Sequence, residues 1–191
     1  MARDNPPSDR RGARAILYRP WQAGDSPQVL TDLLHRAFAD LARCGIHCAS
    51  GNQPSSETLA RIARGWSFVA VDAGRIVGTI TVYPCEQGSG SRVYRDGRVA
   101  SVHQFAVDPG YQGQGVGDAL LRLAECAAKQ AGFSILALDT PKRADKLRAF
   151  YLHMGFRIAE SMRFKGRRYI SLVLEKPLFS TASILPATAW L

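Results

Sequence analysis

A glycine-dense turn between an apolar strand and an amphipathic helix limits what this chain can fold into more than any other feature. Residues 106–126 have the sequence AVDPGYQGQGVGDALLRLAEC, with four glycines between positions 110 and 117. A helix begins with free amide hydrogens and the positive end of its dipole, so its first turn attracts anions. Glycines there let successive amides converge and let a bulky anion approach the backbone. The turn therefore predicts a phosphate site, and its width favours a pyrophosphate.

The competing interpretation is a tight strand-to-helix connection whose glycines serve backbone conformation alone. Two nucleotide-binding motifs fit the turn poorly. A Walker loop needs Lys and Ser or Thr after its last glycine, but Gly115 is followed by Val116. A dinucleotide fingerprint that begins at Gly113 needs glycine where Asp118 stands. A Walker-type ATP site is therefore excluded, and a nicotinamide site is disfavoured.

Hydrophobic periodicity and turn signals divide the chain into alternating strands and helices. The predicted strands lie at 14–19, 67–71, 75–83, 99–107, 134–138, 156–160 and 168–175. The predicted helices run from a cap at Ser26 to near Gly45, from a cap at Ser55 or Ser56 to Gly65, from the glycine turn to Gly132, and from Asp145 to Met154. The buried face of the third helix is expected at Val116, Leu120, Leu123, Ala124, Ala127 and Ala131. This order predicts one α/β (α+β) domain at 13–176, with helices on both sides of a mixed sheet.

Composition limits the setting in which such a domain works. The chain has 191 residues, 46% of them apolar, which suits one globular domain with a substantial core. The start is too polar for a secretory signal, and no apolar run approaches the ~18 residues of a membrane span. We therefore expect a cytoplasmic protein with no membrane partner, whose residues 1–12 form a disordered basic tail. The apolar extension at 177–191 could pack on its own domain, or bury Ile184, Leu185 and Trp190 across a homodimer interface.

The net charge and the cysteine content limit the classes of ligand that the protein is expected to bind. The net charge of +9 favours phosphates, nucleic acid, an anionic membrane or an acidic small molecule as a ligand. We expect no nucleic-acid partner, because the basic residues are dispersed and no aromatic-interleaved motif accompanies them. Cys44, His47 and Cys48 lie close together, but a structural zinc site needs four ligands and the sequence has no second cluster. We expect reduced cysteines and no metal.

Two motifs give the chain a close resemblance to the GNAT N-acetyltransferase superfamily. QGQGVG at 112–117 matches the family signature Gln/Arg-x-x-Gly-x-Gly/Ala and follows the expected apolar strand. AFYLHMGF at 149–156 places an aromatic-Tyr pair four residues before Gly-Phe, as the family does. The resemblance extends over about residues 13–176. It implies a GNAT-type domain, a mostly antiparallel sheet of six to seven strands splayed at its centre, and acetyl transfer from acetyl-CoA to an amine.

The resemblance also implies a place for each part of acetyl-CoA. The turn amides would hold the pyrophosphate, and the exposed backbone of residues 105–107 would pair with the pantetheine arm like an added strand. The thioester carbonyl would meet a strand amide near Phe105 or Ala106. The expected cosubstrate-binding residues are Phe105, Ala106, Val107, Gln112, Gly113, Gln114, Gly115, Val116, Gly117, Asp118 and Tyr151. Many relatives carry Asn seven residues before the tyrosine, but Ala144 stands here, so Lys142, Arg143 or Lys146 could attract the 3'-phosphate instead.

Amine acetylation needs a neutral amine and a proton for the departing thiolate. Tyr151 matches the family tyrosine that acts as general acid, although a helix tyrosine can also be a core residue. His103 is the candidate base, since imidazole titrates near neutrality; a structural strand histidine is the alternative. His103 lies two residues before Phe105 and four before Val107, which predicts that all three side chains share one face. Glu86 is the reserve base if its loop, 86–97, folds over the site.

The acceptor is less constrained than the cosubstrate. We expect a small-molecule amine, with a protein amino terminus or lysine as the alternative. A non-catalytic acetyl-CoA-binding module is a third possibility, in which His103 and Tyr151 have structural roles only. Specificity should come from 42–56, 84–97 and 163–168. The arginines in and near these segments indicate an acidic group on the acceptor or serve solubility alone.

Overall fold

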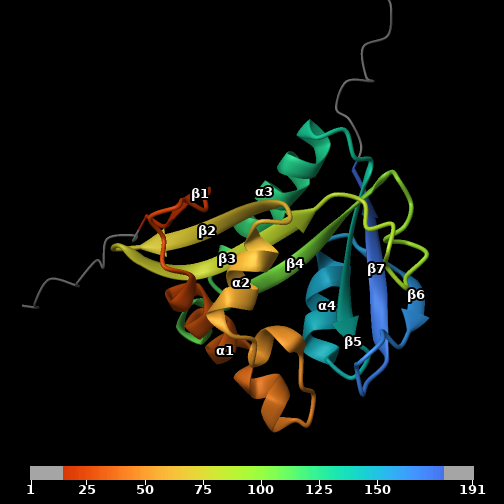
Figure 1. The fold of residues 1–191 in the computed structure, drawn as a ribbon, viewed down its shortest axis with the longest axis horizontal. Helices are drawn as coiled ribbons and strands as arrows, with labels where there is room; N and C mark the ends of the chain where they lie inside the picture. Colours follow the sequence, from red (N-terminus) through yellow and green to blue (C-terminus); the bar gives the residue numbers. More distant parts are fainter. Residues whose placement is uncertain (1–14, 179–191) are drawn as a thin grey trace, which may run out of the picture.

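Among the described residues, seven strands form one sheet in the order β1-β2-β3-β4-β5-β7-β6, and four α-helices cover its two faces (Figure 1). The computed structural model describes residues 15–178. The strands are β1 Leu17–Pro20, β2 Trp66–Asp72, β3 Arg75–Tyr83, β4 Val99–Val107, β5 Ile135–Pro141, β6 Arg157–Met162 and β7 Ser171–Pro177. The helices are α1 Pro27–Arg43, α2 Ser55–Ile62, α3 Val116–Gln130 and α4 Asp145–His153, with short 3-10 turns at Ala49–Gly51 and Pro109–Tyr111. The predicted order of strands and helices is confirmed.

The sheet is antiparallel everywhere except between its two central strands. β4 and β5 are parallel, and they pair only from Val99 with Ile135 to Ser101 with Ala137. Beyond Ser101 the two strands have no pairing with each other, so the sheet splits at its centre. A single α/β (α+β) domain with a mixed, mostly antiparallel sheet that is splayed in the middle was the predicted fold class, and the structure confirms it.

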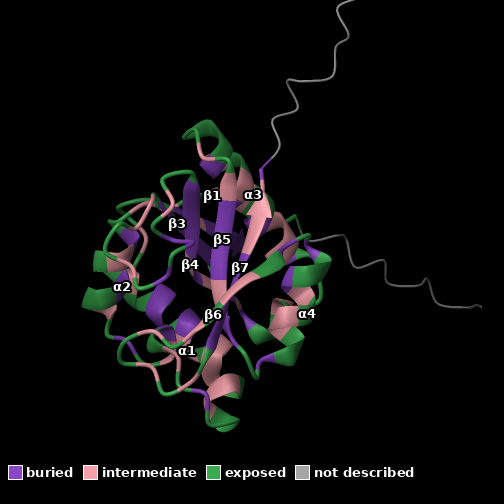
Figure 2. Cartoon of the chain, turned by 90° about the vertical axis from the view of Figure 1, so that its right-hand side faces the viewer, coloured by how far each residue is buried: buried purple, intermediate pink, exposed green. Residues whose placement is uncertain are grey.

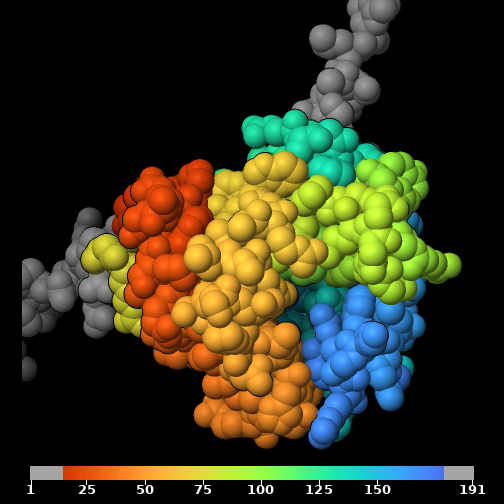
Figure 3. All heavy atoms as spheres, viewed as in Figure 1, coloured from red at the N-terminus to blue at the C-terminus, as the bar shows by residue number. Residues whose placement is uncertain are grey.

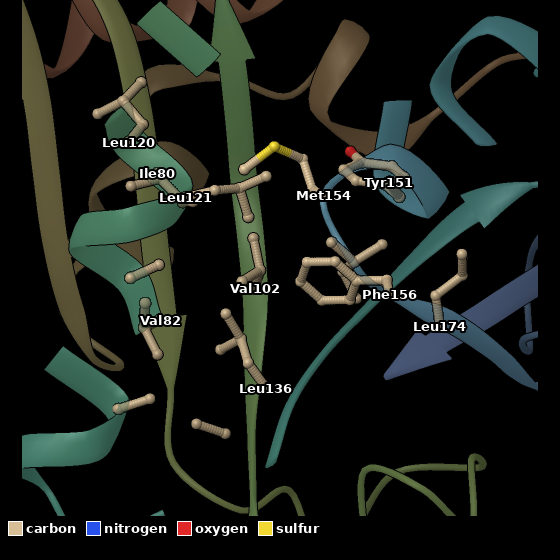
Figure 4. Packing of buried hydrophobic residues seen from close by; sticks show 14 of the residues in the cluster. Ile80, Val82, Val102, Leu120, Leu121, Leu136, Tyr151, Met154, Phe156 and Leu174 are labelled. Carbon is tan, nitrogen blue, oxygen red and sulfur yellow. The ribbon is translucent and has the colours of Figure 1, made fainter. Parts of the chain in front are cut away.

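Apolar faces of the helices fix which side of the sheet each one covers. Leu30 and Leu33 of α1 pack with Ile62 of α2 against β2 and β3. α3 and α4 cover the opposite face, where a larger core cluster gathers side chains from β3, β4, β5 and β7 (Figure 4). Its fully buried large members include Ile80, Leu120, Leu121, Leu136, Leu138 and Leu174. The central strands are accordingly buried on both faces (Figure 2).

The buried face of α3 differs from the predicted one by part of a turn. The buried residues are Val116, Leu120, Leu121, Ala124 and Ala128. The sequence prediction placed Leu123, Ala127 and Ala131 on this face instead of Leu121 and Ala128. Alanine and leucine occupy both candidate stripes, so hydrophobic periodicity alone did not distinguish them. The turn that precedes α3 is positioned by this packing.

A β-bulge interrupts β4 beside the split. Thr81 of β3 pairs with His103, and Thr79 pairs with Ala106, so the β4 side contains one extra residue between the two pairs. Gln104 in this interval has φ +45°, in the left-handed region that residues other than glycine rarely adopt. The extra residue shifts the alternation of β4 side chains by one position.

The bulge overturns one sequence prediction about side-chain direction. His103 and Gln104 both lie on the α2 side of the sheet, where the Gln104 amide donates to Thr58 O at 3.5 Å. Phe105 and Val107 instead pack against the core cluster beneath α3. The prediction that His103, Phe105 and Val107 share one face is therefore wrong, because a period of two does not continue through a bulge.

Two boundaries bear on the site. β5 continues to Pro141, beyond the predicted end at Leu138, which adds Asp139 and Thr140 to the strand at the split. α2 begins at Ser55 after Pro54, without a side-chain cap, whereas Ser26 caps α1 through Val29 N as predicted.

Several expectations concern residues outside 15–178. The predicted tail at 1–12 and the interface residues Ile184, Leu185 and Trp190 lie outside the described residues. Only the first two residues of the 177–191 extension are described, and Leu178 N donates to Ser134 O at 2.7 Å. No helix within 15–178 combines enough length and apolar character to cross a membrane.

Candidate active site

The split between β4 and β5 opens into a cleft of about 580 Å³. Its walls come from α1, the connection to α2, α2 itself, β4, the glycine turn, β5, α4 and the β6–β7 connection. In Figure 3 the orange and gold surface of α1, α2 and their connection faces the blue surface of the β6–β7 hairpin across a hollow with teal β5 atoms at its floor. The predicted site residues that line it are His103, Phe105, Ala106, Val107, Gln112, Gly113, Gly115, Gly117, Asp118 and Tyr151. Glu86, Gln114 and Val116 do not line it.

The glycine turn presents a row of free amides at one end of this cleft. No acceptor within residues 15–178 takes a hydrogen bond from the backbone N–H of residues 113–118. Gly113 and Gly115 have φ of +72° and +81°, which glycine adopts without strain. The Gln112 and Gln114 side chains brace the turn by donating to Val107 O and Gly110 O, at 3.1 and 2.8 Å. Converging free amides at the start of a 15-residue helix fit a diphosphate.

Aromatic rings line the cleft between this turn and the split in the sheet. The Phe105 ring centroid lies 6.3 Å from that of Phe150 and 6.3 Å from that of Tyr151. A Cβ added to Gly117 would lie 3.5 Å from the rings of both phenylalanines, so the helix start is close to this wall. An apolar passage from the phosphate end to the open strand edge fits a pantetheine arm.

Tyr151 places its ring in this wall at the edge of the core, beside Met154 (Figure 4). Burial raises the pKa of the Tyr151 hydroxyl above its usual value of 10.0, and the charge of Asp139 raises it further. The hydroxyl has no hydrogen-bond partner among residues 15–178 and belongs to a side chain that lines the cleft. It therefore stays protonated at neutral pH and can donate a proton there.

His103 is held by two hydrogen bonds on one ring nitrogen. His103 Nε2 lies 2.9 Å from Glu86 Oε1 and 2.9 Å from Ser101 Oγ, and the Ser101 hydroxyl donates to the same carboxylate oxygen at 2.6 Å. The Tyr83 ring stacks on the imidazole with centroids 4.0 Å apart. Arg64 pairs with the other Glu86 oxygen at 3.1 Å. Only the imidazole of this cluster lines the cleft, with Glu86 behind it.

The Glu86 carboxylate is a weak base in this position. Burial would raise its pKa, but hydrogen bonds from His103 and Ser101 and the charges of His103 and Arg64 outweigh burial and lower the pKa to about 2. A carboxylate with so low a pKa holds a proton poorly and accepts hydrogen bonds well. Glu86 is therefore suited to orient His103.

The same shift makes Glu86 a pH-dependent contribution to stability. Its folded pKa, about 2, is below the ordinary value of 4.5, so its stabilisation is complete above about pH 4.5 and is lost as the pH falls through 2. The whole difference corresponds to on the order of 3 kcal/mol. We expect the unfolding free energy from urea titrations to fall more steeply toward acid pH in the native chain than in Glu86→Gln. Parallel pH profiles for the two proteins would contradict this account.

Comparison with known proteins agrees with this geometry. A sequence profile described as "Acetyltransferase (GNAT) family" matches residues 40–156, more than half of the chain. The chain belongs to the GNAT acetyltransferase family. It is thus an acyl-CoA-dependent N-acetyltransferase, and acetyl-CoA is its cosubstrate. The free amides of residues 113–118 fit the diphosphate of that cosubstrate. No significant match was found among curated protein sequences.

Solved structures share the fold of this acetyltransferase at low identity. The PaiA N-acetyltransferase of Thermoplasma acidophilum, solved with coenzyme A, has a TM-score of 0.67 at 17% identity over 85% of this chain and 99% of that one. The ribosomal-protein-S18-alanine N-acetyltransferase of Escherichia coli has a TM-score of 0.66 at 18% identity over 90% and 99%. Ard1 of Thermoplasma volcanium has a TM-score of 0.65 at 19% identity over 87% and 99%.

Only one of the three cations predicted to attract the 3'-phosphate lines the cleft of the acetyltransferase. Lys146 at the start of α4 lines the cleft and has no ion-pair partner within 15–178, whereas Lys142 and Arg143 do not line it. Ala144 is buried and forms no part of the wall. Among the described residues, no group of His, Cys, Asp and Glu side chains could hold a metal ion.

The far end of the cleft contains residues that the sequence did not single out. Arg167 forms a close ion pair with Asp139, whose other oxygen accepts from the Tyr94 hydroxyl at 3.3 Å. The Tyr169 hydroxyl donates to Cys48 Sγ at 3.5 Å, which joins the β6–β7 connection to the α1–α2 connection. The arginine content of 163–168 pointed to this region, but the partners are far apart in sequence and only the fold brings them together.

Proposed function

We propose that the acetyltransferase moves the acetyl group from acetyl-CoA directly to a primary amine of a small molecule, within a ternary complex. The observation that carries the proposal is that free turn amides, the protonated Tyr151 hydroxyl and the oriented His103 imidazole line one cleft. A phosphate-binding turn, a general acid and a general base thereby surround a single opening in the sheet.

The chain's residues would divide the work along the cleft. The amides of residues 113–118 bind the pyrophosphate, and Lys146 attracts the 3'-phosphate. The unpaired edge of β4 beyond Ser101 accepts the pantetheine arm as an added strand. A backbone N–H near the bulge, at Phe105 or Ala106, is the proposed donor to the thioester carbonyl.

His103 is the proposed base. Because Nε2 is engaged by Glu86 and Ser101, the second ring nitrogen, Nδ1, is the one left to take a proton from the amine, directly or through water. Glu86 holds the tautomer and orientation of the ring. Tyr151 then protonates the departing thiolate of coenzyme A.

A small-molecule acceptor is favoured by the shape of the far end. The hydrogen bond from Tyr169 to Cys48 connects the two walls that a polypeptide would have to pass between. The likeness to the S18-alanine and Ard1 acetyltransferases keeps a protein amino terminus as the second candidate. A peptide acceptor would require this contact to open.

The direct test is release of free thiol from acetyl-CoA with separate panels of small amines and of peptides, with mass spectrometry of the acetylated product. We expect small amines to be turned over and peptides to be poor acceptors. If peptides are turned over preferentially, the acceptor is a protein amino group and the proposal of a small-molecule acceptor is wrong. Calorimetric binding of coenzyme A without turnover of any amine or peptide would indicate a non-catalytic module.

Binding of coenzyme A also tests the glycine turn. Gly115→Ala places a Cβ on a residue with φ +81°, which costs about 1 kcal/mol and displaces the flanking amides. We expect coenzyme A to bind about tenfold more weakly by calorimetry, corresponding to about 1.4 kcal/mol. Gly45→Ala is the matched control, because Gly45 has φ +76° and open space around it but lies outside the cleft. Equal affinities for both variants would count against the turn as the phosphate site.

A further inference from the structure

Arg61 on α2 is a half-buried cation in the wall of the cleft. Its Nη1 donates to Ser50 Oγ at 3.2 Å and to Gln53 Oε1 at 2.7 Å, both of them neutral acceptors. No carboxylate within residues 15–178 lies at ion-pair distance from it. Neither Nε nor Nη2 makes a hydrogen bond of good geometry to any described residue, although the guanidinium lies close to the Tyr83 hydroxyl.

The other charged groups around this end of the cleft are already paired. Arg64 binds Glu86, Arg167 binds Asp139, and Asp40 binds Arg43. Arg61 is thus the cation on this side with its charge uncompensated, while Lys146 lies on α4 near the phosphate end. A half-buried guanidinium with one free edge is arranged for a planar anion that accepts two parallel hydrogen bonds.

Arg61 is also close to the proposed base. A side-chain contact with the Arg61 guanidinium, together with its charge, opposes the rise that burial causes in the pKa of the Tyr83 hydroxyl. That hydroxyl has no hydrogen-bond partner of good geometry among the described residues. The Tyr83 ring stacks on His103 with centroids 4.0 Å apart. A group bound at the free edge of Arg61 would therefore belong to a molecule that also reaches His103.

We infer that the acceptor is an amine that carries a carboxylate, and that Arg61 binds this carboxylate through Nε and Nη2 while the amine faces His103. This inference rests on the proposed function and specifies its substrate class. The positive charge of Arg61 also lowers the pKa of a nearby amine, which increases the neutral, nucleophilic fraction. Amines with further ammonium groups are disfavoured by the same charge.

The test uses pairs of acceptors that differ only in the carboxylate. Amino acids and ω-amino carboxylates are compared with their own carboxamides, with thiol release from acetyl-CoA as the readout. We expect kcat/KM to be about tenfold or more higher for the acids, because a charge-assisted pair between Arg61 and a carboxylate is stronger than a hydrogen bond to a neutral carboxamide. In Arg61→Gln this preference should fall to near unity through a higher KM for the acids, with the amides changed less than about twofold.

A control variant separates recognition at Arg61 from a general effect of positive charge. Arg98→Gln removes the same charge from an exposed residue that pairs with Asp96 outside the cleft, and it should change nothing. Loss of the preference in Arg98→Gln would contradict a carboxylate contact at Arg61.

The outcomes distinguish this inference from the proposed function. Turnover without preference for acids, or a preference that survives Arg61→Gln, would overturn the inference and leave the acetyltransferase assignment intact. Better turnover of aminosulfonates or aminophosphonates than of the carboxylates would overturn the assigned anion. Absence of turnover with every acid and amide, with coenzyme A still bound, would remove the proposed small-molecule function and this inference with it.

Discussion

Tyr151→Phe is expected to lower kcat for acetyl transfer by about 10²–10⁴-fold, the usual contribution of a positioned general acid. The substitution removes one oxygen from a ring that otherwise keeps its contacts with Phe105, Phe150 and Phe156. Because the hydroxyl has no partner among the described residues, its removal leaves no protein group unpaired. Folding and coenzyme A affinity should therefore be retained while the thiolate loses its proton donor.

This result is measured as steady thiol release together with calorimetric titration of coenzyme A. Tyr18→Phe serves as the matched control, because Tyr18 on β1 is partly buried and lies outside the cleft. A kcat within about twofold of the native value would show that Tyr151 is a packing residue and that the thiolate leaves without its help.

Gly65→Ala has the largest expected effect on stability. A Cβ on Gly65 would lie 2.0 Å from Val82 O and 2.9 Å from Val82 C, and both are backbone atoms of β3. Since neither can rotate away, β3 or the end of α2 must move, which we expect to cost about 3 kcal/mol or more. For a domain of this size that lowers the melting temperature by roughly 10 °C.

The displacement should also reach the active site. Val82 precedes Tyr83, which stacks on His103, and Gly65 follows the helix that carries Arg61. Gly24→Ala is the control, since it has no atom within 4 Å of the new Cβ and no positive φ. A melting temperature for Gly65→Ala equal to that of this control would show that β3 adjusts without cost.

Much of the fold could be predicted because local signals agree with the final packing. Ser26 with Pro27 marks the start of α1, and the glycine turn marks the start of α3. β4 was predicted with its observed bounds, since β-branched residues and the following Asp-Pro delimit it. One ambiguity remained: two apolar stripes on α3 fit the sequence equally well, and only packing against the sheet selects Leu121 and Ala128.

The sequence motifs of the active site could be predicted, but the strand register and the side-chain partners of its residues could not. The glycine turn and Tyr151 lie in one cleft, as their spacing in the family suggested. The bulge at Gln104 could not be predicted, because it depends on pairing with β3, and it reversed the relation between His103 and Phe105. The fold gives three charged residues of the cleft their partners from other segments of the chain: Arg61, Asp139 and Arg167. No local sequence pattern therefore distinguished them from solvent-exposed charges.

The short pairing between β4 and β5 has a consequence for handling the protein. Beyond Ser101 each of these strands offers unpaired backbone groups, and such edges are templates for association with other chains. In the proposed binding mode a pantetheine arm lies along β4 and satisfies one of these edges, so the cosubstrate would complete the sheet as well as supply the acetyl group. Purification and storage with coenzyme A should accordingly suppress aggregation and raise the melting temperature in proportion to the logarithm of its concentration.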